Sequence, residues 1–381
     1  MDTVMIVTGE SSGELYGSLL AKALKTKYPD VHIIGVGGER MSEAGVELIS
    51  GISSAFGLSE AISSLKAIKD TFSRTIDAIK KFSTKVIVLI DYPDFNIKVA
   101  KVAKKMGVKI LYYVSPQVWA WRKGRVKTIS EISDRIAVIL PFEEEIYKGT
   151  GVPCEFVGHP VLEEIESLTQ DRAVLKAALK VNTDSKVLAL LPGSRSHELK
   201  KLLPVIMDVV KKFKAEFPDY HYQFIVPIAP NINISKYQTF FDMLQDEGVV
   251  LTKENAVKVL AVSDMAVVAS GTATLQAALL EVPMVVIYKL SPLTYHLGRL
   301  VIDVKYISLV NLLSGKGVVP ELIQYRATPG EIIKELKKIM FDMYHREMML
   351  NYFRHIKELF SGKYASQRVA QMIVEMAGWK P

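Results

Sequence analysis

The stretch Leu191-Pro-Gly-Ser-Arg-Ser-His-Glu198 follows a short apolar run, Leu188 to Leu191, and is followed by apolar residues at helical spacing. The stretch Ser270-Gly-Thr-Ala-Thr-Leu-Gln276 repeats this arrangement after Met265 to Ala269. Each stretch predicts a buried strand, a turn of small residues and the start of a helix. Because the first N–H groups of a helix lack partners within it, a helix that begins in this way can bind an anion.

The side chains of the two turns strengthen this prediction. Arg195 carries a planar fork of donors beside the first turn, and Gly271 allows a ligand to approach the backbone closely. Thr272 and Thr274 supply hydroxyl groups. A nucleotide diphosphate suits such a site, and two turns of this kind in one half of the chain favour a nucleotide-sugar enzyme.

Strand-length apolar runs alternate with amphipathic segments along the whole chain. We expect strands at residues 4–8, 31–36, 86–90, 110–114, 136–140, 187–191, 222–226, 265–269 and 284–288, and one that ends at Val157. This alternation is typical of parallel sheets, so the expected fold class is α/β with two Rossmann-like domains. We expect the domains at 1–165 and 166–345, with a turn at Gly158-His-Pro160 near the boundary. The helical pattern of 346–381 predicts C-terminal helices that pack back on the first domain.

The composition limits the class of protein. A chain of 381 residues with 49% hydrophobic content can bury two cores of ordinary size. Its formal charge of +7 favours anionic partners, but no nucleic-acid-binding motif is present, so nucleic acid is not an expected partner. The single cysteine, Cys154, excludes an internal disulfide. No secretory leader and no apolar run of spanning length occur, so a cytoplasmic protein is expected.

The first half carries a turn rich in acids, Thr8-Gly-Glu-Ser-Ser-Gly-Glu14, directly after the first strand. It differs from a dinucleotide fingerprint, because the carboxylates of Glu10 and Glu14 would repel a pyrophosphate. One interpretation is that Ser12 and the two carboxylates bind sugar hydroxyls. The other is that Ser12 caps the following helix while Glu14 interacts favourably with the helix dipole. The sequence leaves both interpretations open.

Asp91 follows the buried strand 86–90, so we expect it at the same edge of the sheet as the Glu10 turn. A carboxylate there can act as the general base for a sugar hydroxyl, although a helix cap is the alternative. Pro93 and Asp94 predict the start of the next helix.

His159 lies at the expected domain junction and is a further candidate, although a lone histidine is more often structural. No group of residues has metal-ligand spacing, so no metal and no cofactor are expected. No Gly-x-Ser-x-Gly turn supports a hydrolase.

Apolar residues recur at helical spacing from Leu58 to Ile79, interspersed with basic residues. An ordinary amphipathic helix packed on the first sheet explains this stripe. The alternative is a helix that rests on an anionic membrane surface and admits acyl chains. The cluster of Trp119, Trp121 and Arg122 suits lipid phosphate at a membrane interface and favours the second interpretation.

Six segments together resemble the lipid A disaccharide synthase family, nearly from end to end of the chain: Gly9–Glu14, Asp91–Asn96, Tyr113–Arg122, Val157–Pro160, Leu191–Arg195 and Ser270–Thr274. The resemblance implies a GT-B fold, with two Rossmann-like domains facing a cleft, and a metal-independent inverting glycosyltransferase. Its substrates would be UDP-2,3-diacylglucosamine and 2,3-diacylglucosamine 1-phosphate (lipid X), joined by a β-1,6 link with release of UDP. The enzyme would act in lipid A biosynthesis, as a peripheral protein on the cytoplasmic face of the inner membrane.

The resemblance also implies roles for individual residues. Asp91 is the favoured base, with Glu10, Ser12 and Glu14 beside it on the acceptor side. The nucleotide would be bound by residues of the two turns and of a third segment: Gly193, Ser194, Arg195, Glu198, Gly271, Thr272, Ala273, Thr274, Gln276 and Asn311. The acceptor or its lipid would be contacted by Trp119, Arg122 and His159.

One position departs from related transferases, which commonly carry a glutamate where this chain has Gln276. A neutral amide accepts at only one atom, so weaker ribose binding is expected unless Glu281 reaches the site.

Two other functions remain open. A UDP-sugar epimerase of the same fold needs no acyl-chain site, so full burial of the stripe from Leu58 to Ile79 would favour it. A sugar-binding protein without catalysis would be favoured if Asp91 were buried and bonded only to backbone.

Overall fold

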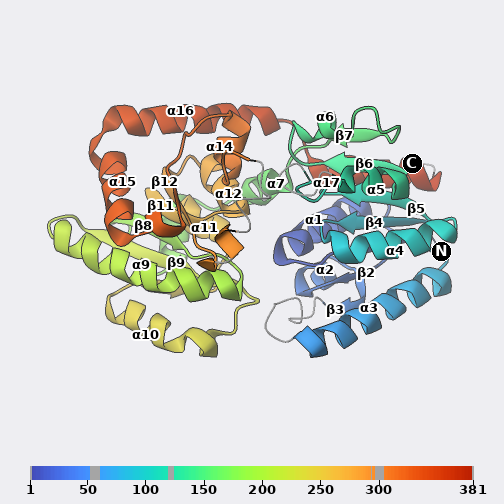
Figure 1. Cartoon of the computed structure of the whole chain (residues 1–381), viewed down its shortest axis with the longest axis horizontal. Coiled ribbons are helices and arrows are strands. Elements are labelled where there is room, and N and C mark those ends of the chain that lie inside the picture. The colour runs from blue at the N-terminus through green and yellow to red at the C-terminus, as the bar shows by residue number, and fades with distance from the viewer. Residues whose placement is uncertain (1, 52–60, 119–123, 293, 297–303, 380–381) are drawn as a thin grey trace. The chain divides into compact units, whose positions relative to one another are not determined.

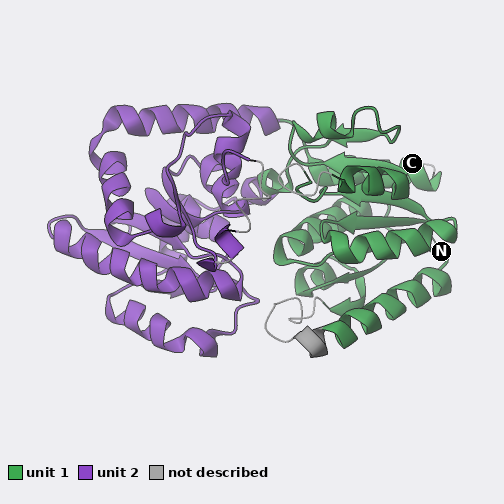
Figure 2. Ribbon diagram, in the orientation of Figure 1, with its two compact units in different colours: residues 1–163, 362–381 green, residues 164–361 purple. Residues whose placement is uncertain are grey.

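The computed structural model describes residues 2–51, 61–118, 124–292, 294–296 and 304–379 (Figure 1). The chain divides into two compact units, of which unit 1 comprises Met1–Glu163 and Gly362–Pro381 and unit 2 comprises Glu164–Ser361 (Figure 2). Each unit has a parallel sheet with helices packed against it. This confirms the α/β class with two Rossmann-like domains.

The described part of unit 1 contains seven strands: β1 (Thr3–Val7), β2 (His32–Gly37), β3 (Glu47–Gly51), β4 (Val86–Ile90), β5 (Lys109–Tyr113), β6 (Arg135–Val138) and β7 (Cys154–Phe156). Its helices are α1 (Ser11–Lys27), α2 (Glu39–Glu43), α3 (Ala61–Lys81), α4 (Pro93–Lys105), α5 (Arg125–Ile132), α6 (Glu143–Tyr147) and α17 (Ala365–Ala377). The helix α7 (Pro160–Glu166) contains the boundary with unit 2. The strands pair in parallel in the order β3-β2-β1-β4-β5-β6-β7.

The core of unit 1 follows from the alternation of side chains along each strand. Met5 and Val7 of β1 and Leu89 of β4 point to one face, where they form a buried cluster with Phe95 of α4. Two helices that pack against each other, α1 and α17, also contact the sheet. Residues of β1 and β4 are buried on both faces, which explains their continuous apolar sequences.

The described part of unit 2 contains six strands: β8 (Lys186–Leu191), β9 (Tyr222–Pro227), β10 (Val250–Thr252), β11 (Met265–Ala269), β12 (Met284–Tyr288) and β13 (Glu321–Ile323). Its α-helices are α8 (Arg172–Ala178), α9 (Ser196–Glu216), α10 (Gln238–Asp246), α11 (Ala256–Ala261), α12 (Thr272–Leu279), α14 (Leu309–Ser314), α15 (Pro329–Phe341) and α16 (Met343–Phe360). Two short 3-10 helices are η2 (Ile234–Tyr237) and η3 (Gln324–Arg326). The strands pair in parallel in the order β10-β9-β8-β11-β12-β13.

All the expected strands are present, and β3, β10 and β13 are additional. Each of the three lies at the edge of its sheet and has mostly half-buried or exposed side chains. An edge strand is covered less completely than a central one, so it needs no continuous apolar run. Apolar periodicity therefore misses these strands.

The C-terminal helices divide between the units, whereas the sequence predicted that residues 346–381 return together. The helix α16 packs on α12, α14 and α15 of unit 2, where its Met349 and Phe353 are buried. Only α17 belongs to unit 1, and it packs on α1, β4 and β5. The unit boundaries therefore lie at residues 163 and 361 rather than at 165 and 345.

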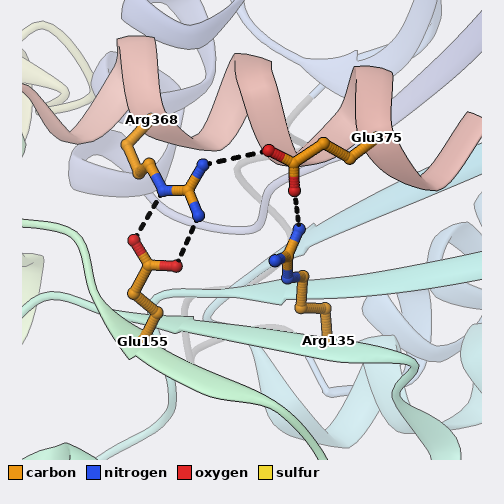
Figure 3. A network of polar contacts seen from close by, with 4 residues as sticks. All are labelled: Arg135, Glu155, Arg368 and Glu375. Atoms are coloured by element: carbon orange, nitrogen blue, oxygen red, sulfur yellow. Dashed lines mark hydrogen bonds and ion pairs between the residues drawn. The ribbon is translucent and has the colours of Figure 1, made fainter. Parts of the chain in front are cut away.

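A network of four charged side chains joins α17 to the sheet of unit 1 (Figure 3). Arg368 donates to both carboxylate oxygens of Glu155 on β7, at 2.5 and 2.7 Å. Arg368 also donates to Glu375 at 3.2 Å, and the other oxygen of Glu375 accepts from Arg135 on β6 at 2.5 Å. The hydrogen bond from Arg368 holds the pKa of Glu155 below its ordinary value, and Arg135 does the same for Glu375. The network therefore depends on both carboxylates being ionised.

Glu155→Gln should lower the free energy of unfolding by about 1 kcal/mol at pH 7, because Arg368 loses its bidentate partner in a partly exposed setting. The pKa of Glu155 in the folded protein lies below the ordinary 4.5, so its contribution is present above that pH. The contribution is lost as the pH falls through the folded value. The difference between variant and wild type should therefore shrink on acidification, as urea unfolding at several pH values would measure.

Glu131→Gln is the matched control, because Glu131 and Lys127 form an exposed pair on α5. Its effect should stay below about 0.5 kcal/mol. Equal effects of the two variants at pH 7 would mean that the network contributes no more than an ordinary surface pair.

Candidate active site

The strand order of each sheet has one switch point. In unit 1 the chain runs outward from β1 to β2 and β3 and then returns to β4, on the other side of β1. In unit 2 it runs from β8 to β9 and β10 and returns to β11. At such a switch point the two following loops diverge, and open α/β sheets bind ligands there, at the carboxyl ends of the strands.

The four segments singled out in the sequence all follow the strands of these two switch points. In unit 1 the Glu10 turn follows β1, and Asp91 follows β4. In unit 2 the turn at 193–195 follows β8, and Gly271 follows β11 after one residue. Each pair of segments is therefore brought to one edge of its own sheet.

Gly9 brings the two loops of unit 1 into contact. A Cβ atom at Gly9 would lie 2.3 Å from Cγ of Tyr92, so only glycine fits this approach. Burial, and then the nearby carboxylates of Asp94 and Glu10, raise the pKa of the Tyr92 hydroxyl to about 12. Glu10 therefore lies close to the segment that begins at Asp91.

The polar residues of the first turn have different surroundings. The helix α1 begins at Ser11 with Glu10 at its N-cap position, so Ser12 lies in the first turn and, of the two interpretations left open, the one in which Ser12 caps the helix is excluded. The carboxylate of Glu14 accepts from the backbone N–H of Arg40 at 3.0 Å, at the start of α2. Glu14 thus fixes a second helix of unit 1, whereas Glu10 and Ser12 are half-buried beside the switch point.

Asp91 lies in a strained turn. The φ angles of Asp91, Tyr92 and Val114 are 49°, 42° and 61°, and this left-handed region costs such residues on the order of 1–3 kcal/mol each. Tyr92 is the N-cap of α4 and Asp94 lies in its first turn, so the start of this helix is as predicted and Asp91 is not its cap. Asp91 is half-buried. Full burial, which would have favoured a binding protein without catalysis, is not found.

His159 belongs to the core of unit 1. Its ring is 1% exposed and lies edge-on to Tyr16, with 5.8 Å between the ring centroids. Its Nδ1 accepts from the backbone N–H of Val161 at 3.2 Å, and burial lowers its pKa to about 3. This corrects the expectation that His159 faces the acceptor, since a neutral, buried ring at the start of α7 has a structural role.

The first turn of unit 2 binds a carboxylate of its own chain. Oε2 of Glu198 accepts from the backbone N–H groups of Ser194 and Arg195, at 3.0 and 3.2 Å. A Cβ atom at Gly193, where φ is 103°, would lie 2.2 Å from that oxygen. The expectation that these N–H groups face a diphosphate is therefore corrected. The turn instead presents the guanidinium of Arg195, whose side chain is 49% exposed.

The second turn of unit 2 is open at its surface. Among the described residues, Gly271 and its two chain neighbours apart, no heavy atom lies within 4 Å of the position that a Cβ would take at Gly271, and no side chain caps α12. The hydroxyl of Thr274 donates to the carbonyl of Gly271 at 2.8 Å, and that of Ser270 donates to Ile307 at 2.8 Å. These two hydroxyls hold the turn, so Thr274 is a structural residue. Thr272 and Ala273 begin α12, whose positive dipole end suits an anion.

Gln276 lies in the same helix, beside the buried carboxylate of Glu164. Its Nε2 donates to Oε2 of Glu164 at 2.9 Å, and both side chains are buried. Glu281 follows the other end of α12 and pairs with Arg354 and Lys357 of α16, at 3.2 and 3.6 Å. Of the two residues considered for the ribose, Gln276 is therefore the one on the side of the open turn.

Asn311 is fully engaged within unit 2. Its Nδ2 donates to the carbonyl of Val319 and to Glu321, at 2.9 and 2.8 Å. Its Oδ1 accepts from the backbone N–H groups of Val318 and Val319, at 2.7 and 2.9 Å. An amide has two donors and two lone pairs, so none is left for a ligand. The expectation that Asn311 contacts the nucleotide is corrected to a role in holding its own loop.

Tyr288 and Lys289, which were not predicted from the sequence, lie at the end of β12, next to β11. Burial, and then the charge of Lys201, lower the pKa of Lys289. Burial, and then Glu198, raise the pKa of Tyr288. The rule that identified Asp91, a polar residue directly after a buried strand, would have found Lys289, whereas Tyr288 is the last residue of the strand itself.

The stripe on α3 is only partly covered. Leu65 is 67% exposed, Phe72 is partly buried against the core, and Ile79 is buried. Full burial, which would have favoured an epimerase, is therefore not found. Trp119, Arg122 and Leu58 lie outside the described residues.

Within the described ranges, no helix is both long and apolar enough to cross a membrane. The same ranges hold no group of three His, Cys, Asp or Glu residues arranged for a metal ion.

The start of a helix at the switch point of one sheet suits the phosphates of a nucleotide, and a carboxylate at the switch point of a second sheet suits group transfer. This combination defines a nucleotide-sugar enzyme with the GT-B fold. A UDP-GlcNAc 2-epimerase from Neisseria meningitidis, solved bound to UDP-GlcNAc, matches 98% of this chain and 99% of its own, with a TM-score of 0.67 and 12% identity. A glycosyltransferase from Rickettsia africae matches 99% of this chain and 97% of its own, with a TM-score of 0.57 and 11% identity. At such identities the likeness shows the fold alone.

The sequence narrows the class to a family. The family model described as Lipid-A-disaccharide synthetase matches residues 4–374. A lipid-A-disaccharide synthase from Geobacter metallireducens is 40% identical over 99% of this chain and 98% of its own. One from Myxococcus xanthus is 38% identical over 98% of this chain and 97% of its own. The chain belongs to the lipid-A-disaccharide synthase family, the glycosyltransferases of lipid A biosynthesis, as its six segments predicted.

Gly9→Ala should reduce glycosyl transfer by about tenfold or more, because the added Cβ displaces Tyr92 and with it the Asp91 turn. Binding of UDP should stay within about twofold of wild type, since the turns that suit a nucleotide belong to unit 2. Initial rates and calorimetric titration with UDP measure the two effects.

Gly330→Ala is the matched control, because no described atom beyond its chain neighbours and the nearby backbone of α15 lies within 4 Å of the new Cβ. It should leave both rate and affinity unchanged. A Gly9→Ala enzyme as active as this control would show that the contact with Tyr92 does not organise the site.

Proposed function

We propose that the protein joins UDP-2,3-diacylglucosamine to 2,3-diacylglucosamine 1-phosphate by a β-1,6 link and releases UDP. The oxygen of the acceptor 6-hydroxyl bonds to C1 of the donor sugar, with inversion, while the bond from C1 to the phosphate oxygen breaks. The hydroxyl proton passes to a carboxylate, and the electrons of the broken bond leave with UDP. Membership of the family supports these substrates, and the placement of Asp91 is the structural observation that carries the proposal.

Asp91 is the proposed base. It follows a buried central strand, lies at the switch point of unit 1 and is half-buried in a strained turn, as is common for residues at active sites. Glu10 and Ser12, at the start of the neighbouring loop, would hydrogen-bond the hydroxyls of the acceptor. Glu14 would act on the site only through the start of α2, which it holds.

The diphosphate would be bound in unit 2 at the start of α12, with the guanidinium of Arg195 and the ammonium of Lys289 as counter-charges. These groups supply positive charge where negative charge grows on the leaving UDP, so the proposed reaction is metal-independent. Gln276, with the carboxylate of Glu164 beside it, would receive the ribose hydroxyls.

We also propose that the protein is peripheral on the cytoplasmic face of the inner membrane. The exposed Leu65 is followed by the exposed Lys66 at the start of α3, an arrangement typical of helices that rest on anionic lipid. The net charge of +7 acts in the same direction.

The reaction is tested by mixing the purified protein with both proposed substrates in detergent, without added metal. A tetraacyl disaccharide phosphate and an equal amount of UDP are expected. Formation of an epimerised UDP-sugar without disaccharide would overturn the proposal in favour of an epimerase.

In the same assay, Asp91→Asn should lower kcat by about 10²–10⁴-fold, because the acceptor hydroxyl loses its base. Asp94→Asn is the control, since Asp94, at the start of α4, is exposed and pairs with Arg125 of α5. It should retain turnover within a few-fold. If Asp91→Asn retains turnover within several-fold while folded, the base lies elsewhere.

Sedimentation with anionic vesicles measures membrane binding. Binding is expected at low salt and should weaken as salt screens exposed charges beyond about 8 Å at physiological ionic strength. Leu65→Ser should reduce it further, whereas Val174→Ser, at an exposed position on α8, should not. A protein that stays in the supernatant with anionic vesicles at low salt would contradict the proposal.

A further inference from the structure

The backbone carbonyl of Asp91 accepts two hydrogen bonds from side chains. Nδ2 of Asn96, on α4, donates at 2.8 Å, and the hydroxyl of Tyr112, on β5, donates at 3.0 Å. Nδ2 of Asn96 also donates to the carbonyl of Ile90 at 3.2 Å. Because both partners of Nδ2 are carbonyl oxygens, they determine the orientation of the amide. Two elements of unit 1 thus bind the backbone of one residue at the end of β4.

Both donors lie in the interior of unit 1. Asn96 and Tyr112 are fully buried, so neither side chain is placed to touch a substrate. Burial raises the pKa of Tyr112 well above its ordinary value, so its hydroxyl stays protonated and remains a donor. Their hydrogen bonds to the backbone of Asp91 connect them to the site.

The two hydrogen bonds act where the backbone is strained. Asp91 and Tyr92 are consecutive left-handed residues, and the N–H of Asp91 donates at 3.2 Å to the carbonyl of Val114, which is itself left-handed. Such conformations persist only when the surroundings hold them. Without its two donors the Asp91 carbonyl could rotate, and the carboxylate would turn with it.

We propose that Tyr112 and Asn96 are positioning residues, whose hydrogen bonds to the Asp91 carbonyl hold the left-handed turn and so orient the Asp91 carboxylate toward the acceptor. This inference rests on the proposed function, in which Asp91 is the base. It adds two buried residues to the machinery of the site.

The neighbouring residue, Tyr113, provides a matched control. It is also a fully buried tyrosine of β5, but it points to the opposite face of the sheet. Its hydroxyl has no hydrogen-bond partner within the described part of the chain. Tyr112→Phe and Tyr113→Phe therefore remove the same atom from adjacent positions, and only the first removes a bond to Asp91.

The test compares these two variants in the disaccharide assay. Tyr112→Phe should lower kcat by about tenfold, with KM for both substrates within about twofold, because a misdirected base affects the transition state rather than binding. The acid limb of its pH profile for kcat/KM should shift, since the base has a new environment. Tyr113→Phe should match wild type in rate and profile. Asn96→Ser, which removes the other donor, should lower kcat at least as much as Tyr112→Phe.

A double variant separates this proposal from the proposed function. In an Asp91→Asn background, Tyr112→Phe should cause no further loss, because there is no base left to orient. An undiminished effect there, or equal rates for Tyr112→Phe and Tyr113→Phe, would overturn the positioning role while leaving Asp91 as base. Full activity of Asp91→Asn alone would instead overturn the proposed base itself, and the positioning role with it.

Discussion

Parallel pairing of the strands is the constraint on which the rest of the structure depends. Parallel strands end at a common edge, so residues far apart in the sequence, such as Glu10 and Asp91, follow neighbouring strands there. The winding changes direction between β1 and β4, and between β8 and β11, and open α/β sheets bind ligands beside the ends of such strands. The polar residues of each unit lie in the loops after these strands, because the strands themselves are buried on both faces and carry apolar side chains.

Five glutamates of the described part of the chain satisfy backbone N–H groups: Glu14 at α2, Glu143 at residue 140, Glu163 at α17, Glu198 at residues 194–195 and Glu321 at residues 307–308. A carboxylate in such a place fixes a loop or a helix start, as an N-cap does. One of the two turns of unit 2 therefore binds an anion of its own chain, and at the other no described side chain caps the helix. Glu14 and Glu198, near the switch points, thus hold the backbone, whereas Asp91 is the proposed base.

The elements that could be predicted are those with a local signature. Central strands such as 86–90 show continuous apolar runs because both their faces are covered, and small residues after them mark the turns. Edge strands such as β10 and β13 have no such run, and the place of α16 depends on which helices it meets. The site shows the same difference. Asp91 could be predicted because it follows a buried strand directly. Tyr112 could not, because its proposed role depends on a hydrogen bond to a residue after a different strand.

The sequence by itself determined two parallel sheets, and the edges at which Asp91 and Gly271 lie, because apolar periodicity sets the strands and parallel order sets their ends. Only the tertiary structure decided that Glu198 occupies the first turn of unit 2, that Asn311 binds its own loop, and that His159 is buried. The physical reason is that the spacing of apolar residues along a helix or strand encodes which of its faces is buried. Hydrogen-bond partners, in contrast, are chosen by the approach of side chains from elements that are distant in the sequence.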